Sequence, residues 1–324
     1  MSGARVLRIG TRASKLALWQ ARHVVALVKA QAAAPAVELV HIRTQGDAQR
    51  DVPLWQVGGR AFFTREIDAA LTAGTIDVAV HSLKDLPTAL APGVTLAATL
   101  ERADPRDALL SASGAPLEAL PQHARIGTSS LRRRAFIARR RPDARPVELR
   151  GNVPTRIERL QAGDYEAIIL AAAGLTRLGL AQHVTQYLPA SDFPPAVSQG
   201  VIGVCARSDD AVTLACLRPL DDRAARLAVS AERALLSRLE GGCQVPLGAL
   251  AELVGQELRI SACVCAHDGS RELRASATQG LRQGAALTVA DAVALGERVA
   301  DELLAAGAAQ LIAQQRESLA VTAP

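Results

Sequence analysis

The chain has 324 residues, of which 49% are apolar and only 2% aromatic, and its 37 basic residues exceed its 32 acidic residues by five. No apolar run approaches the length of a membrane span, and no N-terminal stretch combines a charged start with an apolar segment. Five cysteines without a CxxC spacing argue against a disulfide framework or a zinc site. These features favour a cytoplasmic protein of two or three domains, without a bound metal, that has an anionic partner.

The first part of the chain alternates predicted strands and helices. Strands are predicted over 6–10, 37–43 and 76–81, and helices over Lys15 to about Ala34 and over 62–73. Ser14 or Thr11 is expected to cap the first helix. A strand that ends in a small-residue turn at a helix start exposes unpaired N–H groups, so this turn predicts an anion site.

This pattern recurs in the middle of the chain. Ile126-Gly127-Thr128-Ser129-Ser130 precedes a helix predicted over 131–141, and residues 160–170 echo residues 71–81. The duplication predicts two similar α/β domains, residues 1–100 with 200–218 and residues 104–195, with binding groups at a shared cleft. A strand over 201–205 is expected to return to the first domain.

A third domain of α+β type is predicted over 221–324. Its expected elements are a helix at 222–239, strands at 248–254, 257–266 and 271–277, a hairpin turn at 267–270 and a helix at 289–306. Cys243 lies between Gly241-Gly242 and Pro246, so it is predicted to lie on a tight loop. It is either a reactive thiol or one more small buried residue.

Asp85 follows the strand predicted over 76–81 and precedes Pro87. On position alone it is either a turn-forming aspartate or a carboxylate that donates a proton and then faces a developing cation. The neighbouring His81 and Ser82 are interpreted as turn residues without a catalytic role.

Arginines gather at predicted helix starts and glycine turns. Arg12 lies at the first helix start, and Arg132 and Arg133 lie at the second. Backbone amides and a planar guanidinium together recognise carboxylates or phosphates in a bidentate manner. Further members of the set are Arg150, Arg156 and Arg177. The run 139–141 is interpreted as a solvated basic face.

Five segments of the chain, in this order, resemble motifs of the porphobilinogen deaminase family. They are Ile9-Gly10-Thr11-Arg12-Ala13-Ser14, His81-Ser82-Leu83-Lys84-Asp85-Leu86-Pro87, Gly127-Thr128-Ser129-Ser130-Leu131-Arg132-Arg133, Leu149-Arg150-Gly151-Asn152 and Glu240-Gly241-Gly242-Cys243-Gln244-Val245-Pro246. The resemblance covers Val6 to about Leu253. It implies two periplasmic-binding-protein-like α/β domains plus a smaller C-terminal α+β domain.

The resemblance also implies an activity. Four porphobilinogen molecules would condense head to tail on a dipyrromethane cofactor attached to Cys243, with loss of ammonia, before hydrolysis releases hydroxymethylbilane. Asp85 matches the family's catalytic aspartate. Positions matching cofactor contacts are Lys84, Ser14, Thr128, Ser130, Arg132 and Arg133, and positions matching substrate contacts are Arg12, Arg150, Arg156, Arg177 and Gln199. The implied partner is porphobilinogen, with no nucleic acid or membrane, and the chain is expected to be a monomer.

The chain departs from the family pattern at five positions. Gln56 and Arg60 stand where lysines are usual, Ala61 and Ser198 stand where glycine is usual, and Cys205 replaces a glutamate. Arg60 is a hypothetical contact of a mobile loop. Cys263 and Cys265 share one face of a predicted strand and are expected to be core residues.

Two other readings remain at this point. A two-lobed anion-binding protein without catalysis would also contain the duplicated helix starts. An RNA-binding module would fit the net charge, although few aromatic residues are available to stack on bases.

Overall fold

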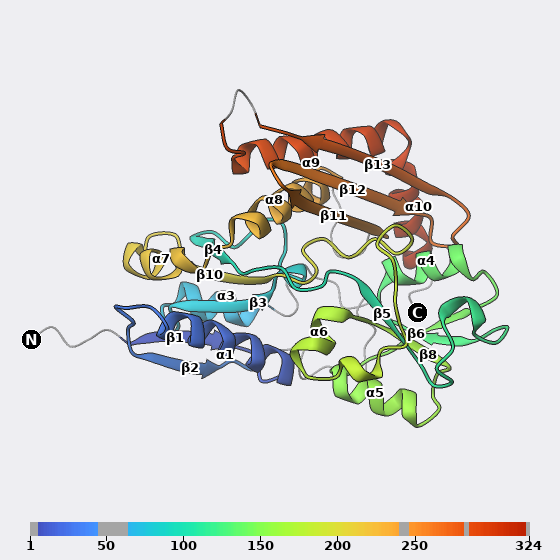
Figure 1. Ribbon diagram of the computed structural model, residues 1–324, viewed down its shortest axis with the longest axis horizontal. Coiled ribbons are helices and arrows are strands. Elements are labelled where there is room, and N and C mark those ends of the chain that lie inside the picture. The colour runs from blue at the N-terminus through green and yellow to red at the C-terminus, as the bar shows by residue number, and fades with distance from the viewer. Residues whose placement is uncertain (1–5, 45–63, 240–245, 282–284, 322–324) are drawn as a thin grey trace, which may run out of the picture. The chain divides into compact units, whose positions relative to one another are not determined.

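The computed structural model describes residues 6–44, 64–239, 246–281 and 285–321, with side chains described as far as residue 314 (Figure 1). The described residues form two compact units. One contains the chain up to Ala103 together with Gly200–Arg226, and the other contains Asp104–Gln199 together with the chain from Leu227 onward. No helix in the described ranges is long and apolar enough to cross a membrane.

The first unit is built on a five-stranded sheet with the order β2-β1-β3-β10-β4. Its strands are β1 (Leu7–Thr11), β2 (Val37–His41), β3 (Val78–Ser82), β4 (Val94–Thr99) and β10 (Ile202–Arg207). The first three are parallel, and β10 runs antiparallel to β3 and β4. The prediction of a strand that returns to this sheet near residue 201 is therefore confirmed. The helical segments of this unit are α1 (Lys15–Lys29), α3 (Arg65–Thr72), α7 (Ala211–Leu217), η1 (Leu83–Asp85) and η4 (Arg218–Leu220).

Helix α1 is shorter than the sequence pattern indicates. It begins at Lys15 as predicted, with Ser14 as its N-cap, but it ends at Lys29 instead of near Ala34. Proline disfavours helical geometry at the residue before it, and Pro35 leads directly into β2 at Val37. The alanine-rich tail of the predicted helix is therefore used as a turn.

The second unit contains a sheet of the same topology, with the order β7-β6-β8-β5-β9. Strands β7, β6 and β8 are parallel, and β5 runs antiparallel to β8 and β9, just as β10 does in the first sheet. This confirms the internal duplication. The elements are β5 (Asp107–Ser111), β6 (Arg125–Gly127), β7 (Arg145–Val147), β8 (Ala167–Ala171), β9 (Gln186–Tyr187), α4 (Leu131–Arg140), α5 (Val153–Gln161), α6 (Ala172–Arg177), η2 (Leu117–Ala119) and η3 (Ala181–His183).

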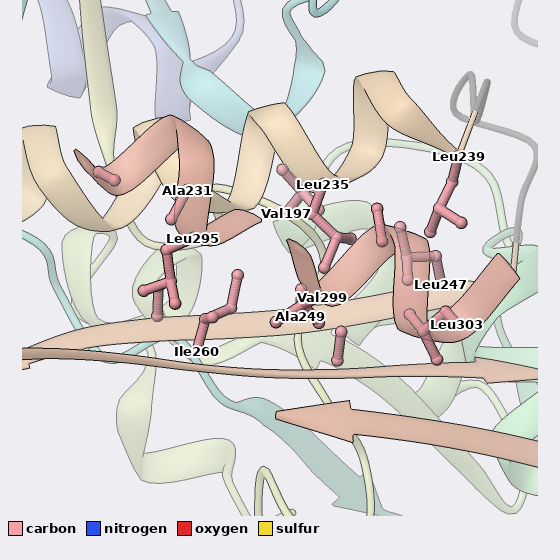
Figure 2. Packing of buried hydrophobic residues seen from close by; sticks show 14 of the residues in the cluster. Val197, Ala231, Leu235, Leu239, Leu247, Ala249, Ile260, Leu295, Val299 and Leu303 are labelled. Carbon is pink, nitrogen blue, oxygen red and sulfur yellow. The ribbon is translucent and has the colours of Figure 1, made fainter. Parts of the chain in front are cut away.

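The rest of the second unit is a three-stranded antiparallel sheet covered by helices. Its elements are α8 (Arg223–Arg238), β11 (Leu247–Val254), β12 (Glu257–Cys265), β13 (Glu272–Gln279), α9 (Val289–Ala305) and α10 (Ala308–Val321). Helix α10 is not predicted from the sequence. Alternation along β12 places Ile260 and its even-numbered neighbours in a core with α8 and α9. Figure 2 shows Leu235, Leu295 and Ile260 meeting in this core.

The opposite face of β12 packs against α4. Cys263 and Cys265 are buried in the same cluster as Phe136 of α4, and the Cys265 thiol lies 3.7 Å from the carbonyl oxygen of Ala135. Burial raises the pKa of Cys263 to about 12 and that of Cys265 to about 11, which keeps both thiols protonated. The two cysteines are core residues, as expected.

Helices α8 and α9 cross at a glycine. A Cβ atom on Gly296 would lie 2.0 Å from the carbonyl oxygen of Ala231 in α8, which is far inside contact distance. We expect Gly296→Ala to lower the free energy of unfolding by about 1–3 kcal/mol, because the helices must separate. Urea titration measures the change. Gly280→Ala is the matched control, since no atom lies within 4 Å of its added carbon, and an equal loss in both variants would contradict the packing argument.

Candidate functional site

Polar groups of the first unit collect at one edge of its sheet. Strands β1 and β3 are parallel neighbours, so their carboxyl ends lie at the same edge. Arg12 and Ser14 follow β1, and Lys84 and Asp85 follow β3. The fold therefore brings together two predicted site segments that are about 70 residues apart in sequence.

Asp85 lies on the short η1 turn that ends β3. Leu83 and Leu86 on either side are buried, and the Leu83 amide donates to the carbonyl oxygen of Val201 at 3.0 Å. These anchors leave Lys84 partly exposed and Asp85 exposed. The predicted position of Asp85 at a strand's carboxyl end is confirmed.

The first helix start is ordered by side-chain caps. Ser14 accepts a hydrogen bond from the Ala17 amide at 3.3 Å, and the buried Thr11 hydroxyl donates to the Ala17 carbonyl oxygen at 3.2 Å. Arg12 lies between these two groups and is half-buried. Both hydroxyls therefore act on the backbone of α1, and they fix the turn that carries Arg12.

His81 is a buried histidine at the same sheet edge. Burial, and then the positive charge of Arg12, lower the pKa of His81 to about 4. Its Nε2 atom has no hydrogen-bond partner among the described residues. The imidazole is therefore neutral at pH 7 and is not a cationic proton donor there.

The second unit has an equivalent helix start at α4. Ser130 caps α4 by accepting from the Arg133 amide at 3.4 Å, and the buried Thr128 hydroxyl accepts from the Ser130 amide at 3.2 Å. Because β6 and β8 are parallel, this turn and helix α6 lie at the same edge of the second sheet.

Arg132 and Arg133 form the most buried charged cluster of this unit. Their side chains are 5% and 8% exposed, and each donates through Nη2 at 2.8 Å to one oxygen of the fully buried Asp107. Burial alone would raise the pKa of Asp107, but the two guanidinium charges, with hydrogen bonds from Arg133 and Gln199, outweigh it and lower that pKa. The cluster of two cations and one anion keeps one excess positive charge.

Arg150, Arg156 and Arg177 belong to the same unit. Arg156 donates from Nε to the Gly151 carbonyl oxygen at 2.7 Å, which fixes it to the turn that also carries Arg150. Arg177 ends α6, and burial lowers the pKa of its guanidinium to about 10. The loss of hydration makes a carboxylate partner favourable for this cation.

Gln199 is placed in the interior of the unit. It is 1% exposed, and its side-chain amide nitrogen donates to the Pro105 carbonyl oxygen at 2.8 Å and to Asp107 Oδ1 at 2.9 Å. Sequence reasoning missed Asp107, although a charged residue that opens the apolar run Ala108-Leu109-Leu110 is a signal of a buried ion pair.

Ser198 occupies a backbone conformation that suits glycine. Its φ is 64°, it is buried, and its hydroxyl has no partner among the described residues. We expect Ser198→Gly to raise the free energy of unfolding by about 0.5–1 kcal/mol, because the relief of strain outweighs the extra freedom that glycine gives the unfolded chain. Thermal and urea unfolding measure the gain. Ser198→Ala keeps the strained Cβ, so an equal gain there would count against this cause.

Several predicted residues lie outside the described residues. They are Cys243 with its flanking glycines, and Gln56, Arg60 and Ala61. The chain is described again from Pro246, and Leu239 and Leu247 on either side of the gap belong to the buried core of the α8, α9 and β11–β13 region.

Each lobe has a helix start with basic side chains, Arg12 at α1 and Arg132 and Arg133 at α4, an arrangement typical of proteins that bind anionic molecules. The dipyrromethane cofactor binding domain model of porphobilinogen deaminase matches residues 7–215, and the C-terminal domain model of the same enzyme matches residues 226–305. The chain belongs to the porphobilinogen deaminase family.

Curated relatives match almost the whole chain. A porphobilinogen deaminase of Roseiflexus sp. strain RS-1 is 50% identical over 309 residues, which cover 95% of this chain and 99% of the relative. That of Roseiflexus castenholzii is 48% identical over 307 residues, covering 95% and 98%.

Solved structures give a weaker likeness. A putative sulfonate-binding periplasmic protein from Methylobacillus flagellatus has a TM-score of 0.39 and 16% identity, covering 74% of this chain and 69% of its own. An ancestral amino-acid-binding protein has a TM-score of 0.35 and 15% identity, covering 66% and 87%. Likenesses of this size say nothing about activity. The predicted fold class, two similar α/β lobes with a smaller C-terminal α+β part, is confirmed by the two sheets of the same topology and by the antiparallel sheet of β11–β13 with its helices.

Proposed function

We propose that the chain is a transferase that joins four porphobilinogen molecules head to tail on a dipyrromethane primer, releasing ammonia at each step and hydroxymethylbilane at the end. The observation that carries the proposal is the buried Arg132–Arg133 cluster, which keeps an excess positive charge within the region matched by the cofactor-binding model. A catalytically inactive two-lobed binder would not need the additional segment that contains Cys243 as well.

The residues present fit a dipyrromethane group. Nε of Arg132 and Nε of Arg133 are buried without a hydrogen-bond partner among the described residues, and such donors call for carboxylate oxygens. We assign the acetate and propionate arms of the cofactor to Arg132, Arg133 and Lys84. Ser14 shapes the start of α1, Thr128 and Ser130 shape the start of α4, and all three are assigned to cofactor binding.

Cys243 is the proposed covalent anchor. A thioether resists hydrolysis, so it would hold the cofactor while the bond to the finished product is cut. When bound, the cofactor would supply the nucleophilic pyrrole carbon that accepts the first unit, and each later unit would add to the free end of the lengthened chain.

Asp85 is the proposed proton donor. Loss of ammonia from porphobilinogen leaves an azafulvene cation, so the reaction requires a carboxylic acid that gives its proton to the leaving amine and then, as a carboxylate, faces the positive charge. The short η1 turn holds this carboxylate at the strand end, beside Lys84.

The remaining arginines are assigned to the carboxylates of the substrate and the lengthening chain. Each pyrrole adds two carboxylates, and unpaired carboxylates away from water are costly. Arg12, Arg150, Arg156 and Arg177 would pair with them in turn. Gln199 acts from the interior, through Asp107.

The chain is proposed to act as a cytoplasmic monomer without nucleic-acid or membrane partners. Its three domains are proposed to be residues 1–100 with 200–218, residues 104–195 and residues 221–324. Supporting this division, the β11–β13 region has a core of its own with α8 and α9. Analytical ultracentrifugation tests the oligomeric state, and we expect a single species with the mass of one chain.

The activity is tested by incubating purified protein with porphobilinogen and measuring ammonia and product together. Hydroxymethylbilane cyclises to uroporphyrin I after acidification and oxidation, which gives an absorbance signal. The proposal predicts four ammonia molecules for each tetrapyrrole. Bound porphobilinogen without ammonia release would instead identify a non-catalytic binder.

A further inference from the structure

Asp107 is the hub of a buried network that includes no group expected to react. It opens β5 and is 0% exposed. Its Oδ2 accepts from Arg132 Nη2 at 2.8 Å, and its Oδ1 accepts from Arg133 Nη2 at 2.8 Å and from Gln199 Nε2 at 2.9 Å.

The other terminal nitrogens of the two arginines are also held by the protein. Arg132 Nη1 donates to the Pro194 carbonyl oxygen at 2.6 Å, and Arg133 Nη1 donates to the Ile169 carbonyl oxygen at 2.8 Å. Four hydrogen bonds thus fix both guanidinium planes. The Nε atom of each arginine is left without a partner among the described residues.

Two unpartnered buried N–H donors distinguish this cluster from a purely structural ion pair. Folded proteins rarely leave such donors unpaired, because the lost hydration is not recovered. Asp107 moreover neutralises only one of the two positive charges. The network therefore fixes the orientation of both guanidinium groups, but among the described residues it provides no acceptor for their Nε–H donors.

We propose that Asp107 is a positioning residue which presents the Nε edges of Arg132 and Arg133 to the carboxylates of the dipyrromethane group. Asp107 itself touches no ligand, and Gln199 supports it from behind. This inference rests on the proposed function, and it adds the residue that sets the geometry of the cofactor arginines.

The network also reaches the strand that follows the cysteine loop. The Ala249 amide of β11 donates to the Pro195 carbonyl oxygen at 2.9 Å, and a Cβ on Gly248 would lie 2.3 Å from the Pro194 carbonyl oxygen. Pro194 is therefore held between Arg132 on one side and β11 on the other. The arginines that Asp107 fixes are therefore connected, through Pro194 and Pro195, to β11, the strand that follows Cys243 in the sequence.

The test follows cofactor loading by intact mass. Apoprotein variants are incubated with porphobilinogen, and the fraction that gains two linked pyrroles is followed in time and divided by the folded fraction from circular dichroism. Asp107→Asn keeps the shape but offers an N–H to a guanidinium, so we expect loading to slow at least about tenfold per folded molecule. Gln199→Met leaves both ion pairs, and we expect a smaller slowing of about twofold to fivefold.

Asp104→Asn is the matched control, because its ion pair with Arg106 is partly exposed and involves neither Arg132 nor Arg133; it is expected to load like the wild type. Normal loading of Asp107→Asn, with or without a lower melting temperature, would show a merely structural role and overturn the proposal. If Asp107→Asn does not fold, unchanged loading of Gln199→Met overturns it. A wild type that never gains the two pyrroles would instead refute the proposed function.

Discussion

Asp85→Ala is expected to lower the rate of hydroxymethylbilane formation by about 10²- to 10⁴-fold while the protein still folds. The carboxylate is the proposed proton donor to the leaving amine. The turn that carries it is held by the buried Leu83 and Leu86, which the substitution does not touch. Removing an exposed side chain costs little stability, so the loss would lie in the chemistry.

Ammonia release measured at saturating porphobilinogen, together with a thermal melt, checks this expectation. Asp209→Ala is a suitable control, because Asp209 is an exposed aspartate of the same unit away from the β3 turn; it should retain full activity. Near-normal turnover by Asp85→Ala would refute the assigned role. A collapsed melting temperature would show that Asp85 is a structural turn residue.

Arg132→Leu is expected to abolish cofactor assembly or the first elongation steps. It removes a proposed donor to the cofactor and leaves Asp107 with only one cation in a fully buried site. Breaking a buried ion pair on one side also costs about 3–5 kcal/mol of stability. Cofactor loading by intact mass and the free energy of unfolding in urea measure the two effects separately.

Two further substitutions make this experiment interpretable. Arg132→Lys keeps the charge but loses the planar fork, so we expect it to fold better than Arg132→Leu and still to load poorly. Arg134→Leu changes the same helix, where it removes a partly exposed ion pair with Glu148 beyond β7, and it should load normally. A fully loaded and active Arg132→Leu protein would contradict the assignment.

The strand-end and helix-start positions of the site could be predicted from the sequence because they depend on local chemistry. Ser14 and Ser130 are side-chain caps that also mark the starts of α1 and α4. Asp85 follows an apolar strand and precedes a turn proline, which places it at a sheet edge without knowledge of the rest of the fold. The duplicated pattern likewise predicts two sheets, and the structure has two of identical topology.

What the sequence did not predict depends on contacts between distant segments. The sequence around Asp107 signals a buried charge, but its partners Arg132, Arg133 and Gln199 are known only from the fold. The resemblance predicts that Gln199 contacts substrate, but the sequence does not predict its burial, which is decided by residues about 90 positions earlier. Helix α1 ends early because the chain must turn to reach β2. Helix propensity does not predict this end, since it does not take the position of β2 into account.

Ser198 combines a feature that the sequence indicates with one that only the fold explains. The family pattern indicates glycine at this position, but only the positive φ explains why glycine is favoured. The backbone amide of Ser198 is also committed, since it donates to the buried carboxylate of Glu232 at 2.6 Å. The serine is therefore held in a strained conformation by the structure around it.

The central claim is that one sulfur holds a two-pyrrole primer on the protein, and the intact mass of the purified chain tests it most directly. The account predicts that the wild type carries an added mass equal to two linked pyrroles, which withstands denaturation, and that Cys243→Ser lacks this mass and forms no hydroxymethylbilane. A Cys243→Ser protein that makes the product at the wild-type rate would contradict the account.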